Sequence, residues 1–338
     1  MASETSVKNA DGVEIWYDFD SSAKTASVTY KGSSSLSEEE YADKVVIPLK
    51  VTYEGEVYSV TKIGDDAFND CSSLTSITLP EGVTEIGGSA FYGCSSLTSI
   101  TLPEGVTEIG GAAFHGCRSL TNITIPEGVT SIGEGAFDGC SSLTSITIPE
   151  SVTSIGDYAF YNCDALTSIT IPKGVTEIGK SAFSSCSSLT SITIPEGVTE
   201  IESYAFYKCG SLTSITLPES VTKIGEDAFY DCSSLTSITS MNATPPSIYG
   251  GSTFYEVDKS IPVYVPKQSV EAYKSAEYWK NFTNIQSLEA YKSTEYRKDS
   301  TNIQGIDDNY SSLTLLLIVS LSVLLVIILL LKVRRVKR

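Results

Sequence analysis

Eight cysteines stand at a constant spacing of 23 residues, and their thiols are the most obvious candidates for chemistry. A regular spacing of this length matches neither a CxxC metal site nor the irregular disulfide framework of a small secreted domain. A small thiol at the same place in every repeat fits an inward-facing corner. The spacing favours buried structural thiols over disulfides between repeats or a metal site, and no metal and no cofactor are expected. These cysteines are Cys71, Cys94, Cys117, Cys140, Cys163, Cys186, Cys209 and Cys232.

Catalysis has little support in the sequence. His115 is the only histidine, and other repeats place tyrosine, aspartate or serine at its position. Nucleophilic catalysis needs a nucleophile, a base and an orienting group in one braced arrangement. Serines that recur in identical settings are the opposite of such an arrangement. We therefore expect no catalytic residues and a protein that is not an enzyme.

Tyrosines are the best candidates for binding. They occur in the residue pairs that precede and follow a recurring Ala-Phe dipeptide, where the repeats differ most. Tyrosine brings a large contact area at a low entropy cost and is enriched in binding surfaces. The alternative interpretation is that these side chains only cover a turn. The candidate ligand-binding residues are Tyr158, Tyr161, Tyr204, Tyr207 and Tyr230.

Hydroxyl side chains form two further periodic columns. One column begins at Ser76 and the other at Thr78, and each recurs every 23 residues, with Asn122 as a substitute in the first. Such a uniform surface lacks the aromatic and arginine anchors that dominate interface energetics. We expect a solvated sheet face, or a weak and multivalent contact with glycan or with another sheet.

The elements that position these columns follow the same period. Each unit of 23 residues, such as CSSLTSITLPEGVTEIGGSAFYG from Cys71 to Gly93, carries one Leu and one Phe at fixed places. Ile77 and Leu79 alternate with polar neighbours, as in a half-buried strand, and Pro80 ends the strand. The phenylalanines predicted to lie in the core are Phe91, Phe114, Phe137, Phe160, Phe183 and Phe206.

Such units are too small to fold alone and must stack on their neighbours. The sequence predicts a mainly β leucine-rich-repeat solenoid, a right-handed superhelix with short turns or 3-10 segments, over residues 61–240. An N-terminal β cap is expected over residues 1–60 and a C-terminal cap over 241–286, with a strand at 261–265 and a short helix from about Ser269.

The remaining residues are predicted to reach a membrane. Residues 287–304 repeat residues 269–286 with 13 of 18 positions identical, but lack their Trp and Phe, so residues 287–312 are interpreted as a stalk. Residues 313–331 are uncharged and long enough for one transmembrane helix. The basic tail 332–338 places the C-terminus in the cytoplasm and the repeats outside. The N-terminus shows no signal-peptide pattern, which leaves a tail-anchored intracellular scaffold as the alternative.

The charge balance argues against one class of partner. The formal net charge is −18, and all 41 acidic residues precede residue 313. Binding to nucleic acid depends on cations that neutralise phosphates. A nucleic-acid partner is therefore not expected.

The repeat S-L-T-S-I-T-[IL]-P-x-x-V-T-x-I-x-x-x-A-F-x-x-C resembles the BspA-like surface antigens, and the resemblance covers about residues 11–286. It implies a solenoid on a cell surface that mediates adhesion or recognition by binding host or microbial surface proteins or glycans. It implies no particular ligand. We therefore expect a single-pass membrane protein with a binding solenoid, and a structural spacer without a specific ligand is a further alternative.

Overall fold

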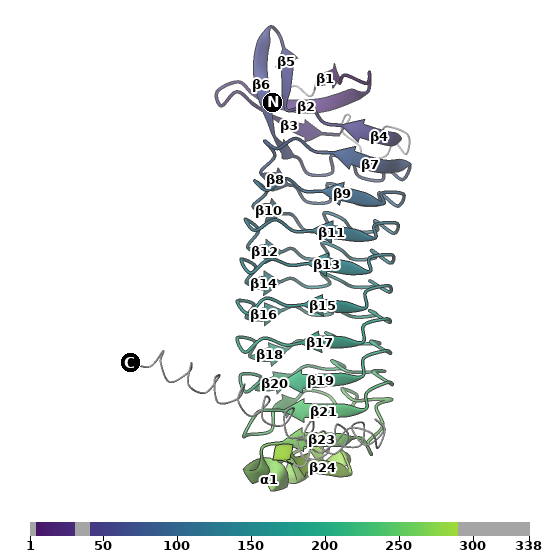
Figure 1. Ribbon diagram of the computed structural model, residues 1–338, viewed down its shortest axis with the longest axis vertical. Helices are drawn as coiled ribbons and strands as arrows, with labels where there is room; N and C mark the ends of the chain where they lie inside the picture. The colour runs from purple at the N-terminus through teal and green to yellow at the C-terminus, as the bar shows by residue number, and fades with distance from the viewer. Residues whose placement is uncertain (1–4, 31–40, 290–338) are drawn as a thin grey trace, which may run out of the picture. The chain divides into compact units, whose positions relative to one another are not determined.

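The computed structural model describes residues 5–30 and 41–289. The described residues up to Leu288 form one compact unit. Columns of short parallel strands run through this unit, one rung above another (Figure 1). The predicted mainly β leucine-rich-repeat solenoid is confirmed in this unit.

The first column contains the predicted strands. They form two sheets, one up to residue 147 and one from residue 168, and within each sheet they pair in parallel with a shift of one repeat, so that Ile77 lies opposite Ile100 and Ile123 opposite Ile146. In each rung the isoleucine points inward and its two neighbours point to solvent, the period-2 pattern of a half-buried strand. The strands are β7 (Leu74–Thr78), β9 (Ser99–Thr101), β11 (Asn122–Thr124), β13 (Ser145–Thr147), β15 (Ser168–Thr170), β17 (Ser191–Thr193), β19 (Ser214–Leu217) and β21 (Ser237–Ser240).

A second column of two-residue strands was not predicted. Each strand ends in an isoleucine that is buried in every full repeat, for example Ile86 and Ile109. Two residues are too few to show an alternation in the sequence, so the pattern carried no strand signal. The strands are β8 (Glu85–Ile86), β10 (Glu108–Ile109), β12 (Ser131–Ile132), β14 (Ser154–Ile155), β16 (Glu177–Ile178), β18 (Glu200–Ile201), β20 (Lys223–Ile224) and β22 (Ser247–Ile248).

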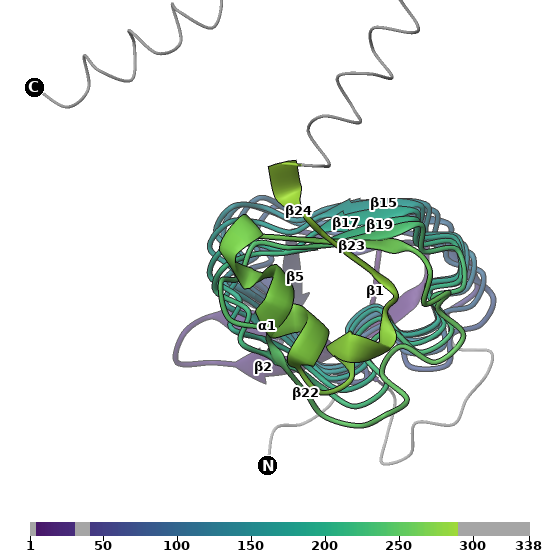
Figure 2. The ribbon, with the colours of Figure 1, turned by 90° about the horizontal axis from the view of Figure 1, so that it is seen from below.

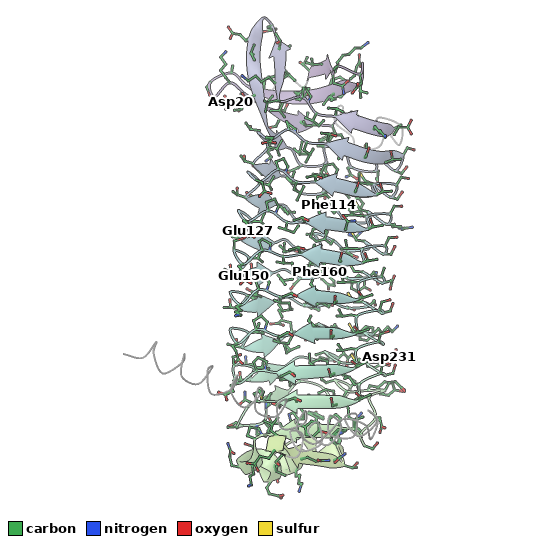
Figure 3. All side chains as sticks on the ribbon, viewed as in Figure 1. Asp20, Phe114, Glu127, Glu150, Phe160 and Asp231 are labelled. Atoms are coloured by element: carbon green, nitrogen blue, oxygen red, sulfur yellow. The ribbon has the colours of Figure 1, made fainter. Side chains whose placement is uncertain are left out.

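Aromatic rings stack through the interior. The ring of Phe160 lies 5.5 Å from that of Phe137 and 5.4 Å from that of Phe183, nearly parallel to both. The phenylalanines Phe68 to Phe229 are all 0% exposed. Figure 3 shows Phe114 and Phe160 between the edge that carries Glu127 and Glu150 and the opposite edge, which carries Asp231. Burial of a side chain of this size stabilises the fold by roughly 1.5–3 kcal/mol.

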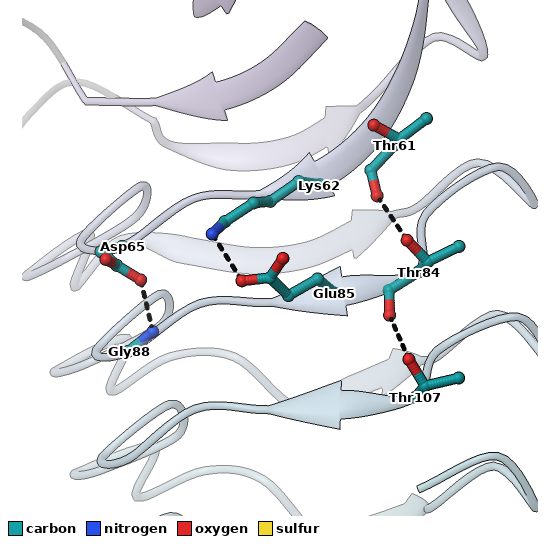
Figure 4. A network of polar contacts seen from close by, with 7 residues as sticks. All are labelled: Thr61, Lys62, Asp65, Thr84, Glu85, Gly88 and Thr107. Atoms are coloured by element: carbon teal, nitrogen blue, oxygen red, sulfur yellow. Dashed lines mark hydrogen bonds and ion pairs between the residues drawn. The ribbon is translucent and has the colours of Figure 1, made fainter. Parts of the chain in front are cut away.

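Polar side chains also connect successive rungs (Figure 4). The Thr84 hydroxyl donates to the Thr61 carbonyl at 3.3 Å, and the Thr107 hydroxyl donates to the Thr84 carbonyl at 3.4 Å. Lys62 pairs with Glu85 at 2.5 Å, at the first step of the second column. The threonine contacts recur further along the solenoid, for example at Thr153 and Thr222, because threonine stands at the same place in each rung.

The N-terminal residues form a β cap from β1 (Thr5–Lys8), β2 (Glu14–Asp20), β3 (Thr25–Thr29), β4 (Asp43–Val46), β5 (Lys50–Tyr53) and β6 (Glu56–Ile63). Strands β1, β2 and β3 are antiparallel neighbours, whereas β4 and β6 run parallel to β7 and β8. The ring of Tyr41 packs on Phe68 at 4.8 Å and covers the end of the phenylalanine stack. Because β6 enters the second column, it crosses the boundary predicted at residue 60.

The C-terminal cap contains β23 (Pro262–Val265), η1 (Lys267–Ser269), α1 (Val270–Ser275), η2 (Trp279–Asn281) and β24 (Asn284–Ser287). Figure 2 shows α1 crossing the end of the stacked rungs. Trp279 is 0% exposed and lies 5.6 Å from Phe254, where it closes the aromatic stack. Its indole N–H donates to the Pro246 carbonyl at 2.9 Å. The second strand, β24, was not predicted.

The predicted stalk beyond residue 289, the predicted transmembrane helix 313–331 and the basic tail 332–338 lie outside the described residues. Within residues 5–30 and 41–289, no helix has the length and apolar character needed to span a bilayer.

Candidate binding edge

The Ala-Phe turn of each rung is held by backbone hydrogen bonds to the next rung. The amide of Phe160 donates to the Ala182 carbonyl at 2.8 Å, and the amide of Tyr158 donates to the Lys180 carbonyl at 2.8 Å. Two residues after the phenylalanine, Asn162 donates to Ser184 at 3.0 Å. This third ladder was not predicted, and it stacks the turns so that equivalent side chains form columns along one edge.

The turn places two residues per rung in the left-handed backbone region. Tyr158 has φ 56° and Asn162 has φ 54°, two residues before and two residues after Phe160. Most other rungs place glycine, aspartate or serine at these positions, for example Gly135 and Asp227, and two of them place Ala112 and Lys208 there. Glycine and short polar residues adopt this conformation readily, whereas a large side chain there is an outlier. Tyr158 and Tyr204, with φ 60°, are therefore in a backbone conformation that does not favour their residue type.

The five predicted tyrosines lie on this edge in two groups. Tyr158 and Tyr161 meet edge to face at 5.9 Å. Tyr204 and Tyr207 meet in the same way at 5.8 Å, and Tyr207 stacks on Tyr230 at 5.0 Å. All five are half-buried.

One rung of small residues separates the two groups. It carries Ser181 and Ser184, which are only 5% and 2% exposed. The structure therefore brings three predicted tyrosines into one continuous contact and places the other two across a rung of buried serines. We call the surface formed by the five predicted tyrosines and Tyr255 the tyrosine edge.

Tyr255 belongs to this surface but was missed in the sequence. Its ring stacks on Tyr230 at 4.8 Å, and it is 50% exposed. The segment around it reads T-F-Y-E-V in place of A-F-x-x-C, and Phe254 follows Phe229 by 25 residues instead of 23. The 23-residue pattern therefore does not extend to this rung. The stacking of Phe254 on Phe229 at 5.4 Å shows that it continues the same columns.

Charged groups surround the tyrosine edge. The amines of Lys180 and Lys208 lie over the rings of Tyr204 and Tyr207, at 5.7 Å and 5.3 Å from the ring centroids. The negative charge of the Glu226 carboxylate raises the pKa of Tyr204, and partial burial of the phenol raises it further. The Tyr204 phenol therefore stays a neutral hydrogen-bond donor and acceptor at neutral pH.

The cysteines lie in the interior, on the inner side of the same turn. All eight are buried. The thiol of Cys163 donates to the Phe137 carbonyl at 3.2 Å, and the thiol of Cys186 donates to the Phe160 carbonyl at 3.1 Å. Burial raises the pKa of Cys163 and Cys186 well above its ordinary value, because ionisation would place a charge in the apolar interior. These groups are therefore weak nucleophiles in the folded protein.

The two hydroxyl columns lie on the exposed face of the first strand column. Ser168 lies opposite Ser191, one repeat further on, and Thr170 lies opposite Thr193, and all four are exposed. A third threonine column, which includes Thr144, instead donates to backbone carbonyls, with Thr144 bonded to the Thr121 carbonyl at 3.2 Å. The exposed face is thus uniform, whereas the tyrosine edge changes from rung to rung.

These features define a leucine-rich-repeat solenoid with short rungs and two structured ends. The chain belongs to the BspA type leucine rich repeat family: the family model matches with six copies, over residues 57–167 and 153–276. The resemblance noted in the repeat motif is thereby confirmed.

Solved structures similar to the chain are bacterial proteins. A leucine-rich cell surface protein from Faecalibacterium prausnitzii A2-165 is 28% identical, over 85% of this chain and 95% of that chain, with a TM-score of 0.46. A leucine-rich repeat protein from T. pallidum is 28% identical, over 68% of this chain and 91% of that chain, with a TM-score of 0.45. A comparison with curated proteins found no match.

Proposed function

We propose that this protein recognises a protein partner at a cell surface through its tyrosine edge, and that residues 313–331 anchor it in a membrane. The proposal assigns it binding without catalysis. Host or microbial surface proteins are the partners that this function implies, and glycans are the alternative class of ligand.

The observation that carries the proposal is the placement of Tyr158 and Tyr204. Both adopt left-handed backbone angles, where the equivalent Gly135 avoids strain. The turn requires this conformation in every rung, and a residue with a side chain adopts it at a cost of roughly 1–2 kcal/mol, so the backbone of the turn does not favour tyrosine at these positions. Strained positions of this kind cluster at functional sites.

The stacking of the rings favours a protein over a glycan. Tyr207, Tyr230 and Tyr255 stack on one another, with centroids 5.0 Å and 4.8 Å apart. Their faces are therefore occupied by each other, and they offer edges and hydroxyls to a partner. A sugar ring that packs on an aromatic face would not find one along this stack. Protein interfaces instead use tyrosine as a large amphipathic contact.

The membrane anchor is supported by composition. Residues 313–331 carry no charge, and five basic residues follow them. By the positive-inside rule, the basic residues favour a cytoplasmic C-terminus and repeats on the outer side. Protease added to intact cells should remove the repeats, and full protection of the repeats would contradict this topology.

Binding is tested by replacing all five predicted tyrosines with serine in the full-length protein. Its binding to an array of extracellular-matrix proteins and to a glycan array is then compared with that of the unchanged protein. The matched control replaces five exposed strand serines (Ser99, Ser145, Ser168, Ser191 and Ser214) with alanine.

The proposal predicts that the unchanged protein binds at least one matrix protein, that the tyrosine variant loses this binding by tenfold or more, and that the control keeps it. A chain that binds nothing on either array supports the spacer function instead. Binding only to glycans, or loss only in the serine control, would move the function to the strand face.

A further inference from the structure

A hollow opens on the edge of the Ala-Phe turns, at the N-terminal side of the tyrosine edge. It has a volume of about 350 Å³ and lies between successive rungs. It arises because the column that contains Tyr158 carries only Ala112 and Gly135 in the two preceding rungs. The ring of Tyr158 therefore stands as a wall beside a floor of small residues.

The opposite wall is His115, which is held in place from two sides. Its ring stacks on Tyr92 with centroids 4.5 Å apart and planes 2° apart. Its Nδ1 atom lies 3.3 Å from a carboxylate oxygen of Asp138. Tyr158, on the other wall, is braced by its edge-to-face contact with Tyr161. The two walls are therefore preorganised and lose little side-chain entropy when a ligand enters.

Two carboxylates line the hollow. Glu134 is exposed, and Asp138 is half-buried beside His115. A carboxylate accepts several hydrogen bonds, so Asp138 can hold His115 and a ligand at once. Among the described residues, no cluster of acidic, histidine and cysteine side chains is suited to a metal ion. The hollow therefore favours an organic cation with several N–H donors.

We propose that this hollow binds an arginine side chain presented by a partner protein. The planar guanidinium stacks on the face of an aromatic ring and donates to carboxylates in a fork, which a compact ammonium cannot do. Tyr158 supplies the ring, and Glu134 and Asp138 supply the acceptors. The net charge of −18 attracts a basic partner toward the solenoid. The inference rests on the proposed function, because it names the kind of residue that the tyrosine edge would recognise in a partner.

The single histidine provides a direct probe. Full-length protein labelled with 13C and 15N at histidine has one imidazole signal, which comes from the wall of the hollow. The protein is titrated at constant pH with N-acetyl-L-arginine methylamide, and separately with the citrulline analogue, which is uncharged and similar in shape. The arginine compound should shift the His115 signal to saturation, and the citrulline compound should bind more weakly by tenfold or more.

Three variants test the site. Glu134→Gln should weaken binding of the arginine compound by about tenfold, because it removes a charge-assisted hydrogen bond. Tyr158→Ser should weaken it severalfold, and serine already occupies the equivalent position at Ser181 with φ 54°. Gly135→Tyr should abolish binding by filling the hollow, since Tyr158 already adopts the same backbone conformation one rung away.

The matched control is Glu127→Gln, which makes the same change at an exposed glutamate on the opposite edge of the solenoid and should leave the titration unchanged. Equal shifts with arginine and citrulline, no shift with either, or a shift that persists in Gly135→Tyr would each overturn the inference. These results can be told apart from failure of the proposed function. Loss of matrix-protein binding on replacing Tyr204, Tyr207 and Tyr230 alone would support the tyrosine edge even if the hollow binds no arginine.

Discussion

The interior columns and the tyrosine edge are built from the same turns but follow opposite rules. In the interior, each full rung repeats one phenylalanine and one cysteine, all buried. On the edge, one column runs through Tyr92, His115 and Asp138 in consecutive rungs. An interior side chain always meets the same neighbours, so the same residue type packs well in every rung. An edge side chain meets solvent or a partner, and its identity is free to differ.

The largest predicted effect is that alkaline pH lowers the free energy of unfolding through the buried thiols of the interior and not through the tyrosine edge. Burial raises the pKa of seven thiols, and that of Cys232 to about 12. In the unfolded chain a thiol titrates near 8.5. Above that pH the unfolded state loses protons that the folded state keeps, so stability falls by about 1.4 kcal/mol per thiol and pH unit.

Urea unfolding at pH 7, 9 and 10 measures this dependence. Cys163→Ala is the control and should reduce the proton release on unfolding by one. The five-tyrosine variant should keep the dependence of the unchanged protein between pH 7 and 9. A stability that stays flat up to pH 10 would show that the thiols are accessible to water, and the interior column would have to be reconsidered.

A single interior ring provides the next largest effect. Phe160→Ala removes a fully buried ring that stacks on Phe137 and Phe183, and should lower the free energy of unfolding by about 3–5 kcal/mol. Tyr161→Ser changes the adjacent, half-buried edge residue and should lower it by about 1 kcal/mol or less. Urea titration compares the two. Similar losses would erase the distinction between interior and edge.

The sequence predicts the interior better than the edge for a physical reason. A period of 23 residues in Phe, Cys and Leu can be satisfied only by stacking in register, so the rungs and the first strand column followed directly. The second strand column escaped notice because each strand has only two residues. The hydrogen bonds of the Ala-Phe turn escaped notice because they use backbone groups, which carry no residue type.

The candidate site was predictable in its residues but not in its grouping. The tyrosines were found because they vary against a constant background. Their separation into two groups depends on Ser181 and Ser184, whose burial follows from the rungs on either side. The hollow beside Tyr158 exists because Ala112 and Gly135 carry no large side chain at the equivalent positions of the two preceding rungs. The space that these small residues leave becomes evident only when the rungs are stacked in three dimensions.

The smallest predicted effect on the free energy of unfolding distinguishes Thr147, which lies in β13, from Thr144, which directly precedes this strand. Thr144 donates to the Thr121 carbonyl of the neighbouring rung at 3.2 Å, whereas Thr147 points to solvent from the uniform hydroxyl face. Thr144→Val should lower the free energy of unfolding by about 0.5–1.5 kcal/mol, the net contribution of one hydrogen bond. Thr147→Val should change it by about 0.5 kcal/mol at most, because valine is well suited to an exposed strand position. Urea titrations of the two variants, measured side by side, provide the comparison. If Thr147→Val proves the more damaging, its hydroxyl takes part in the fold, and the exposed face is no longer a surface that the solenoid leaves free for contact.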